Sequence, residues 1–161
     1  MTIQVGDKVP AGKFKVPTAD GLKDLTTAQL FDGRKVVLFA VPGAFTPTCD
    51  ARHLPGYVEL ADQFRAKGVD AIACLSVNDV FVMKAWGKSG GVGDKIVMLA
   101  DGNGDYTRAL GLTLDAKGFG MGERSQRYAM VVDDGVVKTL NVEDAPGKAD
   151  VSGADNLLKS L

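Results

Sequence analysis

The sequence holds few of the residues from which disulfide frameworks, metal sites and membrane spans are built. Its 161 residues include two cysteines and one histidine, which is too few for a disulfide scaffold and leaves a metal ion short of ligands. The longest apolar stretches are far too short to cross a bilayer. The net charge is −1 and the basic residues are scattered, so neither nucleic acid nor a membrane surface is an expected partner. The chain also lacks the charged-then-apolar start of a signal peptide, and we expect a cytoplasmic protein.

What remains is the composition of a globular α/β domain. Apolar residues make up 45% of the chain, and no linker or low-complexity segment divides it, so we expect one domain over residues 1–161. Short apolar runs alternate with helical segments, which predicts parallel strands with helices on the faces of a sheet, and an Asp-Gly turn predicts an added antiparallel hairpin. This order resembles the thioredoxin fold, with a central mixed sheet and flanking helices. The expected strands are residues 35–41, 69–77, 96–100, 127–132 and 136–142, and the expected helices are residues 48–67, 80–86, 106–110 and 152–160.

The most informative segment is Pro42–Tyr57, which follows the strand 35–41 and contains Cys49. Pro47 suits the first turn of a helix, where a missing N–H does no harm. Cys49 would lie in that turn, among unpaired backbone N–H groups and at the positive end of the helix dipole, which favours the reactive thiolate. The simpler alternative is a small buried hydrophobic residue, but the polar surroundings argue against it. We therefore interpret Cys49 as a catalytic cysteine open to small oxidants, on a helix that Pro55 should bend.

Two side chains near Cys49 have competing interpretations. Thr46 is a helix cap or a hydroxyl that points into the pocket of the thiol, and the two roles can coexist. His53 is four residues beyond Cys49 and on the same helix face. It is the partner in a Cys–His nucleophile pair, a metal ligand, or a structural residue at the helix bend. We favour the pocket role for Thr46 and the structural role, behind the reacting atoms, for His53.

A thiolate at a helix start benefits from a nearby cation, and three arginines are candidates. Arg127 begins a strand that should lie beside the helix of Cys49, Arg124 lies in the preceding loop, and Arg52 is on the helix itself. Spacing alone does not decide between Arg124 and Arg127, and solvated surface charge is the alternative for both. Cys74 lies within an apolar strand and has no basic neighbour in sequence, so we interpret it as a packing residue.

At these residues the sequence resembles the peroxiredoxins, specifically the Prx5 or type II branch. The family pattern Pro-x-x-x-Thr-x-x-Cys is met by Pro42, Thr46 and Cys49. The longer signature Val-Pro-Gly-Ala-Phe-Thr-Pro-x-Cys, followed by His-Leu-Pro-Gly, is matched without a gap from Val41 to Gly56. Further similarity appears in residues 73–79, 84–86, 99–101 and 124–128.

The resemblance implies an enzyme that reduces hydrogen peroxide and alkyl hydroperoxides through a sulfenic acid on Cys49. Cys49 would be the peroxidatic cysteine, Arg127 the activating arginine, and Pro42 a shield against water. Thr46 would orient the peroxide, its hydroxyl accepting a hydrogen bond from the peroxide and donating one to the thiolate. The backbone N–H groups of Thr48 and Cys49 would join Arg127 in stabilising the departing oxygen. No metal, haem or flavin cofactor is expected.

The resemblance also leaves the regeneration of Cys49 to an external thiol. Animal members of the branch carry a further cysteine near the C-terminus, whereas residues 149–153 of this chain contain none. Cys74 is expected to point into the core, and because a disulfide needs Cα atoms within about 7 Å, we expect no direct pairing with Cys49 without local unfolding. We expect a one-cysteine cycle with glutathione and glutaredoxin, or thioredoxin, as reductant, in a homodimer. The rival interpretations are a Cys–His hydrolase using Cys49 and His53, and a redox sensor or binding module on the same fold.

Overall fold

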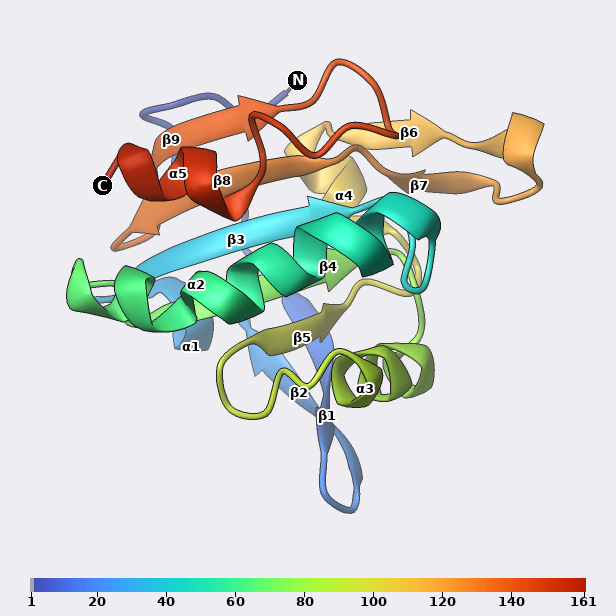
Figure 1. Cartoon of the computed structure of the whole chain (residues 1–161), viewed down its shortest axis with the longest axis horizontal. Coiled ribbons are helices and arrows are strands. Elements are labelled where there is room, and N and C mark those ends of the chain that lie inside the picture. The colour runs from blue at the N-terminus through green and yellow to red at the C-terminus, as the bar shows by residue number, and fades with distance from the viewer. Residues whose placement is uncertain (1) are drawn as a thin grey trace.

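The computed structural model describes residues 2–161, and a mixed sheet of seven strands forms its centre (Figure 1). The strands are ordered β2-β1-β5-β4-β3-β8-β9. Strands β3, β4 and β5 run parallel, whereas β1, β2, β8 and β9 pair antiparallel with their neighbours. A separate antiparallel pair is formed by β6 and β7. The bounds are β1 Lys13–Thr18, β2 Gly21–Thr26, β3 Lys35–Val41, β4 Ala71–Ser76, β5 Val97–Ala100, β6 Thr113–Asp115, β7 Glu123–Ser125, β8 Tyr128–Asp133 and β9 Val136–Val142.

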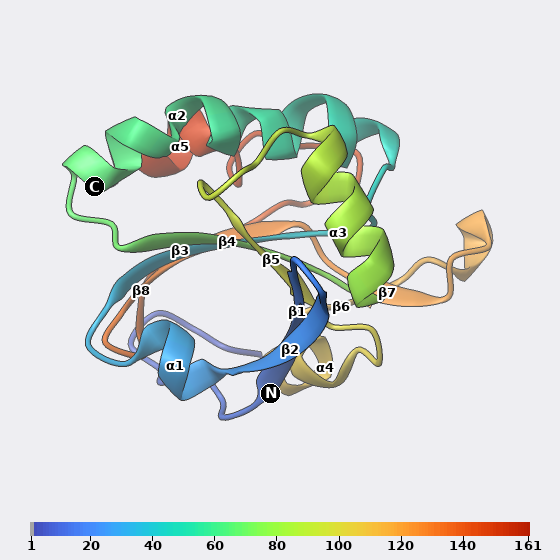
Figure 2. The same ribbon diagram turned by 90° about the horizontal axis from the view of Figure 1, so that it is seen from below.

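Helices cover both faces of the sheet, as the view from below shows (Figure 2). Helices α2, α3 and α5 lie on one face, and α1 and α4 lie on the other. Among residues 2–161, no helix combines the length and the apolar character needed to cross a membrane. The bounds are α1 Thr27–Phe31, α2 Leu54–Ala66, α3 Val80–Ser89, α4 Asp105–Leu110 and α5 Ala154–Lys159, with a short 3-10 turn, η2, at Lys117–Phe119.

The sheet divides the core into two apolar layers. Successive residues of a strand point to opposite faces, and β3 supplies both layers from one unbroken apolar run. Val37 and Phe39 pack in the layer that contains Trp86 of α3, whereas Val36 and Leu38 pack in the layer on the other face. A strand covered on both faces reads in sequence as a continuous apolar run, which is why β3 and β4 are predicted correctly.

Parallel and antiparallel pairing bring the end of β3 and the start of β8 to the same edge of the sheet. The parallel strands β3 and β4 end at the same edge. Strand β8 is antiparallel to β3, with Tyr128 opposite Ala40, so it begins where β3 ends. The segment that leaves β3 and the residue that precedes β8 are thereby brought together. The carboxyl ends of parallel strands are where α/β sheets place their sites.

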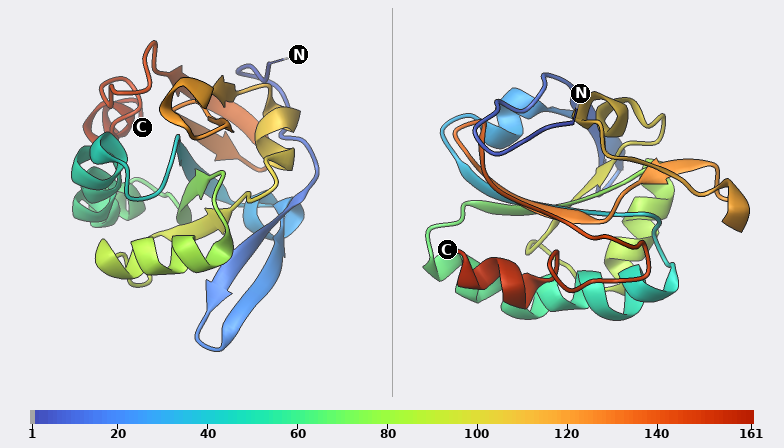
Figure 3. Two further views of the ribbon diagram at one scale, coloured as in Figure 1. Left: turned by 90° about the vertical axis from the view of Figure 1, so that its right-hand side faces the viewer. Right: turned by 90° about the horizontal axis from the view of Figure 1, so that it is seen from above.

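The expected α/β class, with a central mixed sheet and flanking helices, is confirmed, and the five predicted strands agree within two residues at each end. Asp134 and Gly135, between β8 and β9, have φ of 49° and 79°, as a two-residue turn with both central residues at positive φ requires. The β1–β2 hairpin, α1 and the β6–β7 pair are not among the predicted elements. No residue of β2 is fully buried, so its sequence lacks the apolar periodicity that predicts a strand. Figure 3 shows this hairpin projecting from the body of the molecule.

The prediction of one helix over residues 48–67 is wrong, because the segment has two helical parts. Cys49–His53 forms a π-helical turn, η1, in which the N–H of Leu54 donates to the carbonyl of Cys49, and α2 begins at Leu54. Pro55 therefore lies in the first turn of α2 rather than inside a bent helix. In a regular α-helix Pro55 would face the carbonyl of Ala51, to which it cannot donate, and the wide turn accommodates that missing bond.

Candidate active site

Cys49 lies at the start of η1, on the segment that leaves the carboxyl end of β3. The N–H of Asp50 donates to the carbonyl of Thr46 at 2.9 Å, so the N–H groups of Thr48 and Cys49 belong to the first turn, which has no earlier carbonyl to bond within the helix. Those two N–H groups and the helix dipole place positive potential beside the sulfur. The sulfur is also the acceptor of a hydrogen bond from Nη2 of Arg127, at 3.0 Å.

The guanidinium of Arg127 is a buried cation with every nitrogen in use. Arg127 precedes β8, and the pairing of β8 with β3 brings it to the edge where Cys49 lies. Its side chain is nearly enclosed, the residue being 3% exposed. Nε and Nη2 donate to the carbonyl of Pro146 at 3.1 and 2.9 Å, and Nη1 donates to Nδ1 of His53 at 3.0 Å. These hydrogen bonds fix the planar guanidinium with Nη2 directed at the sulfur, and they leave the side chain little freedom to move.

The other two candidate arginines contact other groups. Arg52 forms an ion pair with Asp150 on the surface, with 3.4 Å between Nη2 and Oδ1. Arg124 donates to the carbonyls of Met121 and Val77 at 2.9 and 3.0 Å. Geometry therefore decides the question that spacing leaves open, since Arg127 is the arginine that contacts Cys49 Sγ.

His53 is a neutral spacer between Arg127 and the carbonyl of Ser152. Its Nδ1 accepts from Arg127, so Nε2 carries the proton and donates to the carbonyl of Ser152 at 3.0 Å. Burial first, and then the charge of Arg127, lower the pKa of His53 from 6.5 to about 3, against an opposing effect of the hydrogen bond with Ser152. Because both ring nitrogens are engaged elsewhere, His53 has no free nitrogen to take a proton from Cys49. This geometry argues against the Cys–His hydrolase.

Thr46 makes neither of the hydrogen bonds that we expect from the sequence. Its hydroxyl donates to the carbonyl of Gly43 at 2.6 Å, and no hydrogen bond within the described residues joins it to Cys49 Sγ. Thr46 precedes the helical segment, which begins at Pro47, but no hydrogen bond within the described residues joins its hydroxyl to a backbone N–H of that segment. A hydroxyl has one proton, and here the carbonyl of Gly43 uses it. The lone pairs of the Thr46 oxygen remain available to accept.

A pocket of about 240 Å³ lies over the reactive turn, but Cys49 does not reach its wall. The expectation of a thiol open to small oxidants is wrong for this conformation, in which Cys49 is 0% exposed. The bond to Arg127 and the packing of Cys49 within the apolar layer under α2 hold the sulfur inward. The pocket is lined by Pro42, Thr46, Pro47, Thr48, Leu114, Ala116, Phe119, Met121, Arg127, Pro146 and Gly147.

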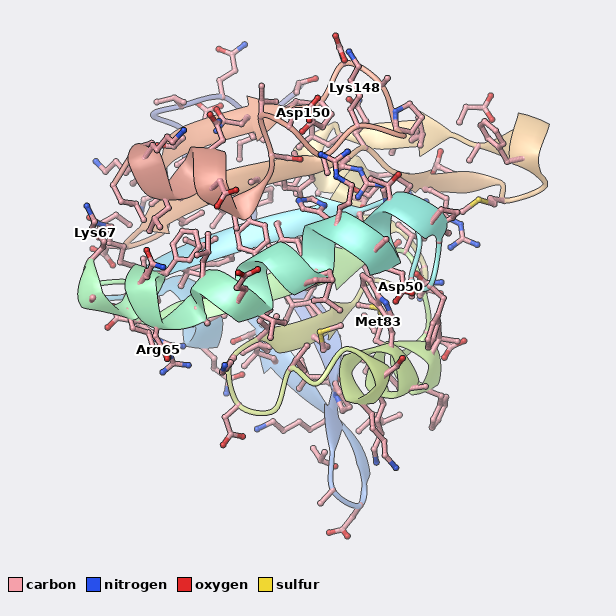
Figure 4. All side chains as sticks on the ribbon, viewed as in Figure 1. Asp50, Arg65, Lys67, Met83, Lys148 and Asp150 are labelled. Atoms are coloured by element: carbon pink, nitrogen blue, oxygen red, sulfur yellow. The ribbon has the colours of Figure 1, made fainter. Side chains whose placement is uncertain are left out.

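Polar contacts that are not predicted from the sequence hold the chain on both sides of Cys49. Oδ1 of Asn78 accepts from the N–H of Ala44 at 3.0 Å and from Ser76 Oγ at 2.5 Å. Asp50, labelled beside α3 in Figure 4, accepts from Nε1 of Trp86 at 2.9 Å. The signal for Asn78 is its position directly after a buried strand of the parallel sheet, at the edge that carries the site. The N-cap of α3 is the next residue, Asp79, so the side chain of Asn78 is free for this contact.

Cys74 is fully buried in the central strand β4, and both cysteines are free. Burial, and then the neighbouring Cys49, raise the pKa of the Cys74 thiol well above its usual value, with Arg127 opposing. A buried thiol that stays protonated is a poor nucleophile. Within residues 2–161, no three His, Cys, Asp or Glu side chains gather in a way that would hold a metal ion.

The chain is similar to known proteins over almost its whole length. The Redoxin family profile matches residues 4–158. A protein named "Peroxiredoxin-2E-2, chloroplastic" from Oryza sativa subsp. japonica is 56% identical, with 99% of this chain and 73% of the relative covered. "Peroxiredoxin-2B" from Arabidopsis thaliana is 49% identical, with 99% and 98% covered. Among solved structures, reduced Prx3 from Vibrio vulnificus in complex with H2O2 has a TM-score of 0.93 and 55% identity, with 99% of each chain covered.

Replacing Arg127 should make the Cys49 thiolate harder to form. In a Cys74→Ser background, we expect the pH midpoint of iodoacetamide alkylation to move upward by about one to three pH units in Arg127→Gln. Arg127→Lys should give an intermediate shift, because an ammonium keeps the charge but not the fork geometry. Arg52→Gln removes a surface cation of the same segment and is the matched control. A midpoint that is unchanged in Arg127→Gln would show that the contact does not stabilise the thiolate.

His53 should remain neutral across the physiological range. It is the only histidine of the chain, so its ring proton resonance in an NMR spectrum is unambiguous, and we expect no titration between about pH 5 and 8. Since the folded-state pKa is lowered to about 3, the unfolded chain binds the extra proton below about pH 6.5. His53 should therefore lower the free energy of unfolding by about 1.4 kcal/mol per pH unit as the pH falls through that window. A resonance that titrates near its ordinary pKa would refute this assignment.

Proposed function

This chain belongs to the Redoxin family and is a peroxiredoxin, an oxidoreductase that reduces peroxides with a thiol, and we propose that Cys49 is its peroxidatic residue. The observation that carries the proposal is the 3.0 Å hydrogen bond from Nη2 of the buried Arg127 to Cys49 Sγ. Cys74, the other cysteine, has no comparable cation in contact and is kept protonated by burial. Only the thiolate is a good nucleophile, so the position of Arg127 selects Cys49.

In the proposed first step, the Cys49 thiolate attacks the terminal oxygen of a hydroperoxide. The S–O bond forms as the O–O bond breaks, which leaves Cys49 as a sulfenic acid and releases an alkoxide or hydroxide that takes a proton to become an alcohol or water. Negative charge moves from sulfur to the departing oxygen. Nη2 of Arg127 and the N–H groups of Thr48 and Cys49 would stabilise it as hydrogen-bond donors.

Thr46 and Pro42 would prepare the site for that step. The Thr46 oxygen, whose proton is held by Gly43, would accept a hydrogen bond from the peroxide O–H and hold the O–O bond in line with the sulfur. Pro42 is buried and has no N–H, so it would limit the water around the thiolate. A peroxide would enter from the 240 Å³ pocket, where these two residues and Arg127 form part of the wall. Because Cys49 lies behind that wall, its side chain or the wall would have to move before the peroxide reaches the sulfur.

The composition of the pocket supports hydrogen peroxide and small alkyl hydroperoxides as substrates. Leu114, Phe119 and Met121 add apolar wall to the polar residues near the sulfur, which suits an alkyl group beside a reacting peroxide. The relative from Vibrio vulnificus was solved in complex with H2O2, and its 55% identity over nearly the whole chain supports the smaller substrate for this protein.

We propose that an external thiol regenerates Cys49. Cys74 is held in the central strand β4, between β3 and β5, and a bridge to it would require local unfolding. One molecule of glutathione, or a thiol of glutaredoxin or thioredoxin, would attack the sulfenic acid and release water, leaving a mixed disulfide. A second thiol would then free Cys49 as a thiol and leave with the disulfide.

We also propose that the chain forms a homodimer. Phe45 and Phe119 are large apolar side chains that are 47% and 78% exposed. Phe119 lines the pocket and Phe45 lies on the segment between Pro42 and Cys49. Exposed aromatic side chains near a site are common at protein interfaces. A second copy of the chain would cover them.

The two cysteines should differ sharply in peroxidase assays. Cys49→Ser should abolish hydrogen peroxide consumption in the presence of a dithiol, because it removes the only thiol beside Arg127. Cys74→Ser should retain most of the activity, since it changes one packing atom. The rate of peroxide loss measures both. Full activity in Cys49→Ser, or activity lost only in Cys74→Ser, would reject the proposal.

Mass spectrometry should distinguish the proposed one-cysteine cycle from an internal disulfide. After one equivalent of hydrogen peroxide and then glutathione, we expect a single glutathione adduct on Cys49, because the other thiol, Cys74, is buried in β4 and stays protonated. Digestion under non-reducing conditions locates the adduct, and Cys49→Ser is the blank. A stoichiometric bridge between Cys49 and Cys74 would contradict this cycle while leaving Cys49 as the peroxidatic residue.

A further inference from the structure

Glu143 is a buried carboxylate that does not touch the reacting atoms. It follows β9 and is 8% exposed. Its Oε2 accepts from the N–H of Ser152 at 2.7 Å and from Ser152 Oγ at 2.6 Å. No ion pair within residues 2–161 involves it. A carboxylate is costly to bury without a cation. The two hydrogen bonds that Glu143 accepts from Ser152 therefore indicate a functional role for this carboxylate.

Ser152 connects Glu143 to His53. It is fully buried in the loop before α5, and this loop lies beside the start of α2 in the view from above (Figure 3). The carbonyl of Ser152 accepts from Nε2 of His53 at 3.0 Å and from the hydroxyl of Tyr57 at 2.6 Å. A peptide whose N–H is bound by a carboxylate and whose carbonyl accepts two donors is fixed in orientation. The bonds also polarise one another in the same direction.

These contacts close a ring that contains Arg127. The N–H of Glu143 donates to the backbone carbonyl of Arg127 at 2.9 Å, and the guanidinium of Arg127 donates to Nδ1 of His53 at 3.0 Å. The ring therefore runs from the backbone of Arg127 through Glu143, Ser152 and His53 to the side chain of the same arginine. All four residues are buried. Nη1 of Arg127 makes the contact with His53, and Nη2 of the same guanidinium reaches Cys49 Sγ.

We propose that Glu143 and Ser152 are positioning residues of the peroxidase site, which hold Arg127 against Cys49 by fixing the orientation and tautomer of His53. This inference rests on the proposed role of Cys49 and extends it to the segment before α5. If the peptide of Ser152 turned, His53 would lose the acceptor that keeps its proton on Nε2. Nδ1 would then no longer be a reliable acceptor for Arg127. A displacement of about 1 Å in a stabilising donor is enough to slow a reaction by about a hundredfold.

The test compares Glu143→Gln and Ser152→Ala with the control Asp150→Asn. Asp150 is a carboxylate of the same segment, labelled in Figure 4, whose side chain is 63% exposed. In a Cys74→Ser background we expect Glu143→Gln to lower the second-order rate constant with hydrogen peroxide by about tenfold to a hundredfold and to move the alkylation midpoint of Cys49 to higher pH. Ser152→Ala keeps the backbone bond to Glu143 and should show a smaller effect of the same sign. Asp150→Asn should match the parent protein.

The direction of the shift separates positioning from simple electrostatics. Removing a negative charge near a thiolate would, by Coulomb's law alone, ease its formation and move the midpoint to lower pH. A midpoint that moves to lower pH in Glu143→Gln, or parent values of rate and midpoint in both folded variants, would overturn the proposal. The NMR signal of His53 gives an independent readout, because weaker hydrogen bonds to its imidazole should change the tautomer.

Two further outcomes distinguish a failure of this inference from misfolding of a variant and from a failure of the proposed function. If Glu143→Gln does not fold, shown by loss of cooperative unfolding, the milder Ser152→Ala decides alone. If the parent protein consumes no peroxide, the proposed function fails. The alkylation midpoint and the tautomer of His53 still show whether Glu143 and Ser152 position Arg127.

Discussion

One hydrogen bond, from Nη2 of Arg127 to the sulfur of Cys49, is the contact on which this site depends. At 3.0 Å and away from solvent, it places a permanent positive charge where a thiolate would otherwise be costly to bury. The fold supplies this contact through strand direction. Because β8 is antiparallel to β3, the residue before β8 meets the segment that follows β3. Arg127 and Cys49 are thereby brought together across 78 positions of sequence.

The surroundings of Arg127 explain why its guanidinium is held so firmly. Pro146 offers a carbonyl to two of its nitrogens and His53 offers a ring nitrogen to the third. A protonated His53 would oppose the arginine, and burial together with that charge lowers the pKa of His53 to about 3. Neutral His53 can then serve as an acceptor. In the sequence, a histidine four residues from a reactive cysteine suggests a proton-transfer pair. In the structure, this histidine instead accepts a hydrogen bond from Arg127 and so helps to hold the guanidinium in place.

The sequence predicts those parts of the molecule that leave a local signal. Strands β3 and β4 are continuous apolar runs because both of their faces are covered, and the β8–β9 turn carries an Asp-Gly pair. The exposed strand β2 leaves no such signal, and the π-helical turn η1 cannot be distinguished from an α-helix in the sequence pattern. The site follows the same division. Cys49 and the family pattern around it are found from sequence. The contacts of Arg127 with Pro146, and of His53 with Ser152, span 19 and 99 positions and follow only from the fold.

Peroxide reduction by Cys49 requires its sulfur to be a thiolate, and the ultraviolet absorbance of thiolates measures this directly. All three tyrosines are buried, which raises the pKa of each above its usual value, so their ionisation does not interfere near neutrality. We expect a thiolate band at neutral pH in Cys74→Ser that disappears in Cys49→Ser/Cys74→Ser. A band in the first protein that emerges only at alkaline pH would contradict the proposed role of the contact between Arg127 and Cys49.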